Sequence, residues 1–284
     1  MERRTDYRNQ LIFRNPSIKP DNWLRNNKQQ FAESFAQEIY LSNTIYSHIP
    51  KNASSTMRYS VALANGLITQ ETDISWVYAN NMTFTPSLRF QRLADYTFVI
   101  LRCPYSRLAS AFLDQIVRRP HMYLMQQRKT GIRRVVVDQI IARHITFERF
   151  VLKLRDDRGF LRLNAHWRPQ VDFLLYENYS DYFCVEAMNV AVDTLKSKID
   201  LNVVDTRSLA KHGIDRFRKI DIEKGFKLSV PQFRKMKNEN TILDPKCLYS
   251  KELLNIVSEL YSEDIDLYKS KFGDKNLMFK SSYL

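Results

Sequence analysis

Short apolar runs alternate with helix-like stretches along most of the chain. The strongest run, Tyr96-Thr97-Phe98-Val99-Ile100-Leu101, is aromatic, β-branched and almost continuous, which is typical of a buried parallel strand. Shorter runs of the same kind occupy residues 45–49 and 182–185. Each run precedes a stretch with helical character. These stretches are residues 55–65 after the first run, residues 104–117 after the strongest run, and a stretch that ends at about residue 199 after the third. This alternation predicts an α/β fold with a central parallel sheet flanked by helices.

Capping residues mark the ends of several predicted helices. Gly66 follows the first helix as a C-cap residue, and Pro104 lies in the first turn of the second. Thr146 is the expected N-cap of the segment TFERFVLKLRD, whose apolar positions share one face. A last helix is predicted from about Lys251 to Tyr268.

The first part of the chain differs from the rest. Residues 1–40 are polar and mixed, with Pro16 and Pro20, and we expect an arm or short surface helices there. Residues 41–284 are expected to form one domain. The opening MERRTDYRNQ lacks the apolar core of a signal peptide, and no apolar run approaches the length of a membrane helix.

The charge of the chain indicates an anionic partner. Lys and Arg number 44 against 31 Asp and Glu, giving a formal net charge of +13. Such an excess suits a nucleotide, an acidic glycan, a nucleic acid or a membrane surface, and does not choose among them. The cysteines, Cys103, Cys184 and Cys247, are widely spaced without a metal-binding pattern, so we expect reduced thiols and a cytoplasmic protein.

A first candidate anion site lies in the stretch HIPKNASSTM, between a predicted strand and a predicted helix. The first N–H groups of a helix lack partners within the helix, and the helix dipole adds positive potential, so this turn attracts anions. Lys51 adds a charge, and nearby small or hydroxyl side chains let a phosphate approach. A capped helix with a solvent-facing lysine explains the same stretch about as well. The candidate binding residues are Pro50, Lys51, Asn52, Ala53, Ser54, Ser55 and Thr56.

A second candidate anion site follows the strongest strand, in RCPYSRLASAF. Arg102 lies at the carboxyl end of that strand, where α/β proteins bind ligands, and its planar guanidinium suits a phosphate. Ser110, in the following helix, adds a hydroxyl. Two such sites on one sheet predict a ligand with two separated phosphates. The chain has only 6 glycines and neither GxGxxG nor GxxxxGK[ST].

Together these segments resemble sulfotransferases that use 3′-phosphoadenosine 5′-phosphosulfate (PAPS). PKNASST is similar to their 5′-phosphosulfate loop, and RCPYSRLASAF to their 3′-phosphate motif. NAHWRPQ, residues 164–170, resembles the HWxPQ signature of the carbohydrate branch that includes the chondroitin, dermatan and HNK-1 enzymes. TFERFV, FCVEAM and a closing Y-x-x-D at Tyr261 and Asp264 follow in the same order. The likeness covers roughly residues 45–268 and suggests a soluble homologue of bacterial type.

The resemblance implies a fold, a donor and roles for residues. The fold would be a P-loop-like three-layer sandwich, and PAPS would be the co-substrate, with no metal. Lys51 would contact the oxygen that bridges phosphate and sulfonate, residues 52–56 would cradle the 5′-phosphate, and Arg102 and Ser110 would hold the 3′-phosphate. The reaction would be in-line transfer of a sulfonate to an acceptor hydroxyl, catalysed mainly by positioning and electrostatics.

The chain departs from the family pattern in three ways. Cys103 stands where the motif has Asp or Asn after its arginine, so the local geometry is expected to differ. The paired cysteines that the lumenal enzymes carry after HWxPQ are missing, with no cysteine before Cys184. The membrane anchor of those enzymes is also missing from this sequence. The last two departures fit a cytoplasmic homologue.

The acceptor hydroxyl needs a general base or an orienting group. Among the five histidines, His166 is the first candidate because it lies in the HWRPQ segment, although it could instead hold a loop through the backbone. His121 is a second acceptor-side candidate, and His48 is expected in the core. Trp167 either stacks on a sugar or, as we favour, packs inside.

Several basic clusters have two interpretations. They could line a groove for an acidic glycan, or be solvated faces, and they lack the aromatics of a single-stranded nucleic-acid platform. Three functions stay open: a sulfotransferase acting on a carbohydrate or another, possibly anionic, hydroxyl acceptor; a P-loop-like nucleotide phosphotransferase; or a non-catalytic polyanion-binding protein. The clusters are Arg118-Arg119, Arg128-Lys129, Arg133-Arg134 and Arg234, Lys235 and Lys237.

Overall fold

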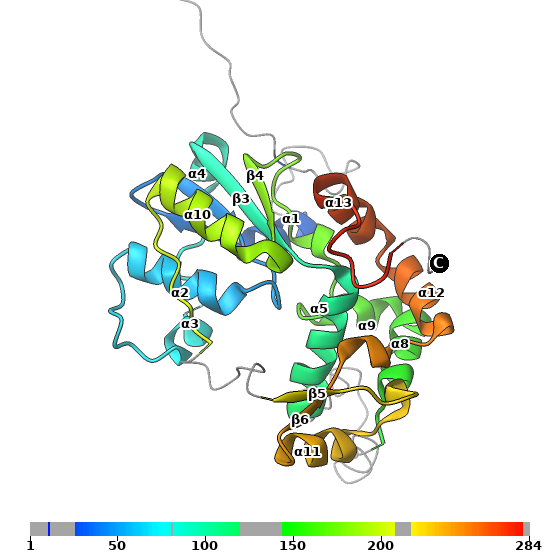
Figure 1. The fold of residues 1–284 in the computed structure, drawn as a ribbon. Helices are drawn as coiled ribbons and strands as arrows, with labels where there is room; N and C mark the ends of the chain where they lie inside the picture. Colours follow the sequence, from blue (N-terminus) through cyan, green and yellow to red (C-terminus); the bar gives the residue numbers. More distant parts are fainter. Residues whose placement is uncertain (1–10, 12–25, 81, 120–143, 208–216, 281–284) are drawn as a thin grey trace, which may run out of the picture. The chain divides into compact units, whose positions relative to one another are not determined.

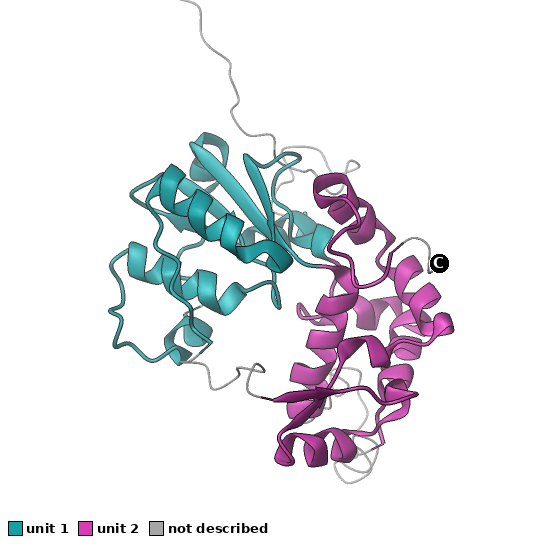
Figure 2. Ribbon diagram, viewed as in Figure 1, with its two compact units in different colours: residues 1–102, 170–212 teal, residues 103–169, 213–284 magenta. Residues whose placement is uncertain are grey.

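The computed structural model describes residue 11 and residues 26–80, 82–119, 144–207 and 217–280. The chain forms two compact units, coloured separately in Figure 2. Unit 1 comprises residues 1–102 and 170–212, and unit 2 comprises residues 103–169 and 213–284. Each unit is therefore built from two separate stretches of the sequence.

Unit 1 is organised around a four-stranded sheet with the order β1-β2-β3-β4 (Figure 1). Strand β2 pairs in parallel with β3, and β3 with β4, as the sequence predicts. Strand β1 pairs antiparallel with β2 and begins inside the segment that we expected to be an arm. The strands are β1 (Ala36–Ile39), β2 (Thr44–Ser47), β3 (Tyr96–Leu101) and β4 (Asp181–Cys184).

Helices cover both faces of this sheet. On one face, Tyr46 and Phe98 stack with ring centroids 4.8 Å apart and share a core with Met57 of α2 and Leu195 of α10. On the other face, Phe173 packs against Phe35, which follows α1. The helices of this unit are α1 (Asn27–Ser34), α2 (Ser54–Ala64), α3 (Ser75–Ala79), α4 (Leu88–Leu93) and α10 (Met188–Ile199), with 3₁₀ turns at Gln170–Phe173 and Val185–Ala187.

The end of α2 follows the sequence prediction closely. Gly66 has a φ of 73°, in the left-handed region that glycine adopts without strain. Its N–H donates to the Leu63 carbonyl, and the next N–H donates to Ala62, so the last carbonyls of the helix are satisfied. The C-cap residue itself is Asn65, so Gly66 ends the helix from the position after the predicted one.

Unit 2 is mainly helical. Aromatic rings form its core: Phe150 packs edge-on against Trp167 at 5.4 Å and tilted against Phe112 at 5.7 Å. Strands β5 (Arg218–Ile220) and β6 (Thr241–Leu243) form a small separate parallel sheet. The helices are α5 (Pro104–Ala111), a π-helix (Phe112–Arg118), α8 (Phe147–Asp156), α9 (Arg158–Leu163), α11 (Val230–Asn238), α12 (Lys251–Leu260) and α13 (Ser262–Phe272), with 3₁₀ turns at Gly225–Lys227 and Pro245–Leu248.

Two helix predictions in unit 2 need correction. The stretch expected to be one helix up to Val117 changes to π-helical pairing at Phe112. The predicted last helix is two helices, which break at Tyr261, where φ is −118° and ψ is 28°. The hydroxyl of Tyr261 donates to the Trp167 carbonyl, and this buried bond fixes the residue at the break. The N-cap role predicted for Thr146 is confirmed, since its Oγ1 accepts from Arg149 N at 3.2 Å.

The α/β class and the mostly parallel central sheet are confirmed. The P-loop-like three-layer description and the domain boundary at residue 40 stay predictions. Over the described ranges, no helix combines the length and the apolar character needed to cross a membrane.

Candidate active site

The β2–α2 loop has the backbone form of an anion site. Lys51 and Ala53 have φ values of 74° and 55°, which non-glycine residues adopt at a cost of about 1 kcal/mol or more each. Ala53 is the N-cap residue of α2, and no side chain caps the helix. The first turn of α2 therefore has no side-chain cap, and N–H groups at an uncapped helix start are suited to an anion.

Asn52 ties this loop to the sheet and to the turn at Gln170. Its side chain is fully buried, and Nδ2 donates to the Ile100 carbonyl at 2.9 Å and to Gln170 Oε1 at 2.6 Å. Since Ile100 belongs to β3, the loop after β2 is held against the neighbouring strand. Asn52 thus positions the loop through its side chain, beyond the backbone role that the resemblance implies.

Hydrogen bonds fix both the backbone and the side chain of Arg102. Its backbone N–H donates to Gln170 Oε1 at 3.0 Å, and its carbonyl accepts from Gln170 Nε2 at 2.9 Å. Its Nη1 donates to the Lys51 carbonyl at 2.8 Å. Within unit 1, Arg102 at the end of β3 is therefore joined directly to the first candidate loop at Lys51, and indirectly through Gln170.

The other residues of the first loop surround the start of α2. Pro50 is buried and Ser54 is half-buried. Ser55 Oγ lies 3.0 Å from the Tyr78 hydroxyl, and Thr56 Oγ1 lies 2.9 Å from Thr206 Oγ1. The hydroxyls that we expected to contact a phosphate are thus held in place by hydroxyl partners.

Unit 2 contains Arg107, Ser110 and most of the HWRPQ segment. Ser110 is half-buried on α5. Arg107 is 2% exposed and donates to the carbonyls of Arg168 at 2.7 Å and Ala165 at 3.0 Å. Trp167 is 1% exposed and its Nε1 donates to the Phe160 carbonyl at 3.0 Å. The structure therefore gives Trp167 the packing role and leaves no face for a sugar.

The candidate bases differ in how the structure presents them. His166 is half-buried, and both its backbone N–H and its Nδ1 lie 2.8 Å from Asn164 Oδ1. If Nδ1 carries the proton, Nε2 is left as the basic atom of the ring. His48 is 4% exposed, as expected for a core residue. His121 lies outside the described residues.

Cys103, which stands where the family motif has Asp or Asn, makes a hydrogen bond in the structure. The Cys103 side chain is buried, and its Sγ accepts a hydrogen bond from Met278 N at 3.2 Å. The position after the motif arginine therefore contacts the C-terminal segment of unit 2. A thiol suits this buried position because it is a small apolar group with weak polar capacity.

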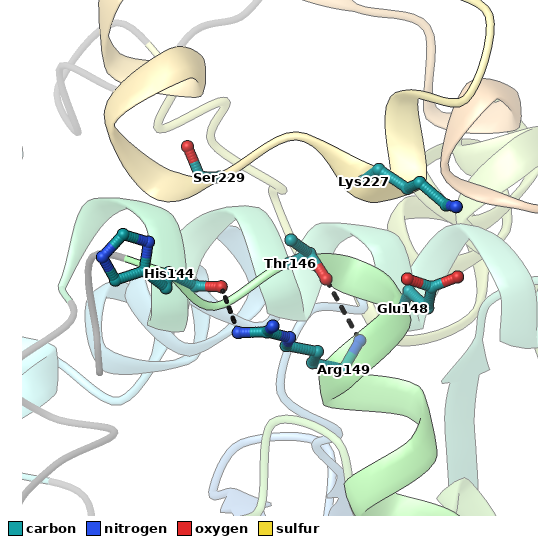
Figure 3. Close-up of a pocket in the computed structure, with 6 residues that line it drawn as sticks. All are labelled: His144, Thr146, Glu148, Arg149, Lys227 and Ser229. Carbon is teal, nitrogen blue, oxygen red and sulfur yellow. Dashed lines mark hydrogen bonds between the residues drawn. The ribbon is translucent and has the colours of Figure 1, made fainter. Parts of the chain in front are cut away.

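A separate hollow in unit 2 was not predicted from the sequence. Its volume is about 330 Å³. Figure 3 shows the His144 ring at one end and Lys227 and Glu148 at the other. Arg149, between them, donates from Nη1 to the His144 carbonyl at 3.3 Å. The charges are mixed, and none of the predicted site residues lines the hollow.

Of the basic clusters, those at residues 128–129 and 133–134 lie outside the described residues. Lys235 is exposed and lies 4.0 Å from Glu239, which fits a solvated face. Arg234 donates to the Val117 carbonyl at 3.3 Å, and Arg118 pairs with Asp114 at 2.5 Å. The contacts of these three residues give no support to a groove.

Sequence reasoning did not single out Gln170, Arg58 and Tyr78. In the sequence, Gln170 is only the last residue of HWRPQ. Its hydrogen bonds to Asn52 and Arg102 form only in the folded chain. Arg58 lies on α2 and Tyr78 on α3, and neither belongs to a motif that the sequence marks. In the described part of the chain, no three side chains gather as metal ligands.

Comparison with known proteins gives one match. A family model described as "Sulfotransferase family" matches residues 42–271, which is most of the chain. No curated protein and no solved structure matches. The matched range includes both candidate phosphate loops and the whole HWRPQ segment.

Proposed function

Because the chain belongs to the sulfotransferase family, we propose that it transfers a sulfonate group from PAPS to a hydroxyl of a carbohydrate. The observation that carries this proposal is the connection, within unit 1, between the loop after β2 and Arg102 at the end of β3. Gln170 bonds both Asn52 of the first loop and Arg102 after β3, and Arg102 bonds the Lys51 carbonyl. A donor with a phosphate at each end of its ribose needs two such loops held at a fixed spacing.

The first loop would bind the 5′-phosphosulfate. The uncapped start of α2 offers backbone N–H groups, and Ser54, Ser55 and Thr56 offer hydroxyls beside them. Anions are stabilised at a helix N-terminus by these donors and by the helix dipole. Ala53, with its small side chain, allows the phosphate to approach the backbone.

The second loop would bind the 3′-phosphate. Arg102 supplies a planar cation whose direction is set by its bond to the Lys51 carbonyl. The expected contribution of Ser110, eight residues along the chain on α5, rests on the motif resemblance.

The chemical step would be an in-line displacement at sulfur. The acceptor oxygen forms a bond to sulfur while the bond from sulfur to the bridging oxygen breaks, and the electron pair stays on the departing phosphate. Lys51 would stabilise that negative charge, an effect for which one donor is worth about 10²–10³ in rate. His166 would take the acceptor proton on Nε2, with Asn164 orienting the ring through Nδ1.

A transfer assay tests the proposal. Radiolabelled PAPS is incubated with the protein and a mixture of oligosaccharides, and label in the sugar fraction is measured. We expect PAPS-dependent labelling that Lys51→Ala and His166→Ala each reduce about 100-fold or more. Lys28→Ala, at an exposed lysine of α1, is the matched control and should keep full activity. Labelling that is unchanged in Lys51→Ala would contradict the mechanism.

A further inference from the structure

One edge of the unit 1 sheet lies away from the candidate site. The site residues follow the carboxyl ends of β2 and β3, whereas both strands begin at the opposite edge, where Thr44 pairs in register with Tyr96. The turn between β1 and β2 leads into this second edge, and α4 lies beside the start of β3 (Figure 1). The proposed function gives this edge no role.

Large apolar side chains are exposed along this second edge. Leu41, in the turn between β1 and β2, is 95% exposed, and its neighbour Tyr40 is 48% exposed. On α4, Phe90 and Leu93 are 44% and 50% exposed, and their spacing in the sequence places them on one face of the helix. We call these four residues the apolar rim. Single exposed apolar residues are ordinary, but a group of them marks a surface that binds a partner.

Hydrogen bonds hold the turn of the rim against the end of α4. Asn43, whose φ is 44°, donates from Nδ2 to the Leu93 carbonyl at 3.2 Å and to Asp95 Oδ2 at 2.9 Å. The Asn43 carbonyl in turn accepts from Asp95 N at 2.9 Å. Asn65, at the end of α2, accepts from Tyr40 N at 3.0 Å. The apolar rim is therefore fixed in place, and its exposure does not come from a loose turn.

The charged residues of α4 suit an anionic surface. This helix contains Arg89 and Arg92 and no acidic residue. Arg89 is exposed and precedes Leu93 by four positions, so the two lie on the same face of the helix. A long basic side chain keeps its charge among lipid headgroups while apolar neighbours enter the acyl region. The net charge of +13 adds a long-range attraction to such a surface.

A lipid surface fits these residues better than a protein partner does. A protein interface packs as tightly as a protein interior, so a protruding leucine needs a matching pocket in the partner. A bilayer takes up a protruding apolar side chain without such a pocket. Tyrosine and arginine favour the level of the headgroups, because each has an apolar body and a polar end. Leu41, with Tyr40 and the arginines of α4, thus has the composition of an interfacial anchor.

We propose that the apolar rim, together with Arg89 and Arg92, docks unit 1 on a membrane surface that contains anionic lipid. Leu41 would enter the acyl region, and the two guanidinium groups would lie among the phosphates and carboxylates of the headgroups. The loop after β2 and Arg102 would then lie on the side of the sheet away from the lipid. This inference goes beyond the proposed function and does not depend on it.

The test measures how much of the full chain sediments with lipid vesicles. We expect the wild type to bind vesicles of phosphatidylcholine with phosphatidylserine about tenfold or more tightly than vesicles of phosphatidylcholine alone. Leu41→Ser should weaken this binding about tenfold, and Arg89→Ala about fivefold. Val190→Ser is the matched control, because Val190 is a 52% exposed apolar residue on α10 of the same unit, and it should bind as the wild type does.

Because Leu41 and Arg89 are exposed, both variants should keep the urea midpoint of the wild type and its affinity for 3′-phosphoadenosine 5′-phosphate (PAP). If both variants bind the anionic vesicles as the wild type does, the net charge alone attracts the lipid and the proposal is overturned. A wild type that binds neither kind of vesicle overturns it as well. If the wild type is a dimer that Leu41→Ser dissociates, the apolar rim is an interface between two copies of the chain, and the proposal is again wrong.

Discussion

The side-chain amide of Asn52 donates a 2.6 Å hydrogen bond to Oε1 of Gln170, 118 residues further along the chain. The same Oε1 accepts from the backbone N–H of Arg102. One glutamine thus sets the spacing between the loop after β2 and the end of β3. Under the proposed function, this spacing matches the two phosphates of the donor.

Removing this glutamine should loosen both loops. Gln170→Ala removes one acceptor from Asn52 Nδ2 and removes the Gln170 bonds of the Arg102 N–H and carbonyl. Since each buried unsatisfied group costs about 1–3 kcal/mol, we expect the free energy of unfolding to fall by about 3 kcal/mol. PAP affinity should fall as well. Urea unfolding and calorimetry measure the two effects.

The matched control is Gln70→Ala, at an exposed glutamine of the same unit. It should change neither stability nor PAP affinity. Equal behaviour of the two variants would show that the Gln170 bonds do not hold the loops.

The titration of His48 gives a prediction about pH. Burial, and then the nearby Arg58, lower the pKa of His48 from 6.5 to about 3. His48 therefore binds a proton more readily in the unfolded chain than in the folded one. The stability that neutral His48 contributes is complete above pH 6.5 and is lost as the pH falls toward 3. We expect the unfolding free energy to fall in this window by up to about 1.4 kcal/mol per pH unit from this group.

His48→Gln removes the titrating group and provides the comparison. Urea unfolding at several values between pH 8 and pH 5 should give a steeper acid loss for the wild type than for the variant. Parallel curves for the two proteins would mean that His48 keeps an ordinary pKa in the folded state.

Arg107 is expected to matter for folding rather than for donor binding. Its guanidinium bonds two carbonyls next to the HWRPQ tryptophan, and hydrogen bonds to charged groups are worth about 1.5–3 kcal/mol each. Arg107→Ala should therefore lower the unfolding free energy by about 3 kcal/mol or more. Below the melting temperature, PAP affinity should stay within about twofold of the wild type, a change of less than 1 kcal/mol. A stable variant with weak PAP binding would instead place Arg107 at the nucleotide.

The sequence predicted the sheet well because its strands are buried on both faces. The run Tyr96–Leu101 matches β3 residue for residue, since continuous β-branched and aromatic positions fit little else. The break at Tyr261 was missed because the helical periodicity continues through it. Only the hydroxyl bond from Tyr261 to Trp167, a contact distant in sequence, distinguishes that residue from its neighbours.

The sequence could predict those site residues that both suit an anion and lie near the end of a predicted strand. Arg102 directly follows β3 and Lys51 lies in the loop after β2, and strand ends are where a parallel sheet binds ligands. Gln170 acts through contacts that the fold creates, so no local pattern marks it. Trp167 is a residue whose type suggests a binding role that its position excludes. An aromatic ring can stack on a sugar, but Trp167 is only 1% exposed.

Specific binding of the product nucleotide tests the central claim most directly. Thermal melts are recorded with PAP, with AMP, and with ATP and Mg²⁺, for the wild type, Arg102→Ala and the control Arg89→Ala. PAP at about 100 times its dissociation constant stabilises the folded state by about 2.7 kcal/mol. We expect the melting temperature to rise by several degrees with PAP alone, an effect lost in Arg102→Ala and kept in Arg89→Ala. An equal rise with AMP or with ATP and Mg²⁺, or a PAP effect that survives in Arg102→Ala, would contradict it.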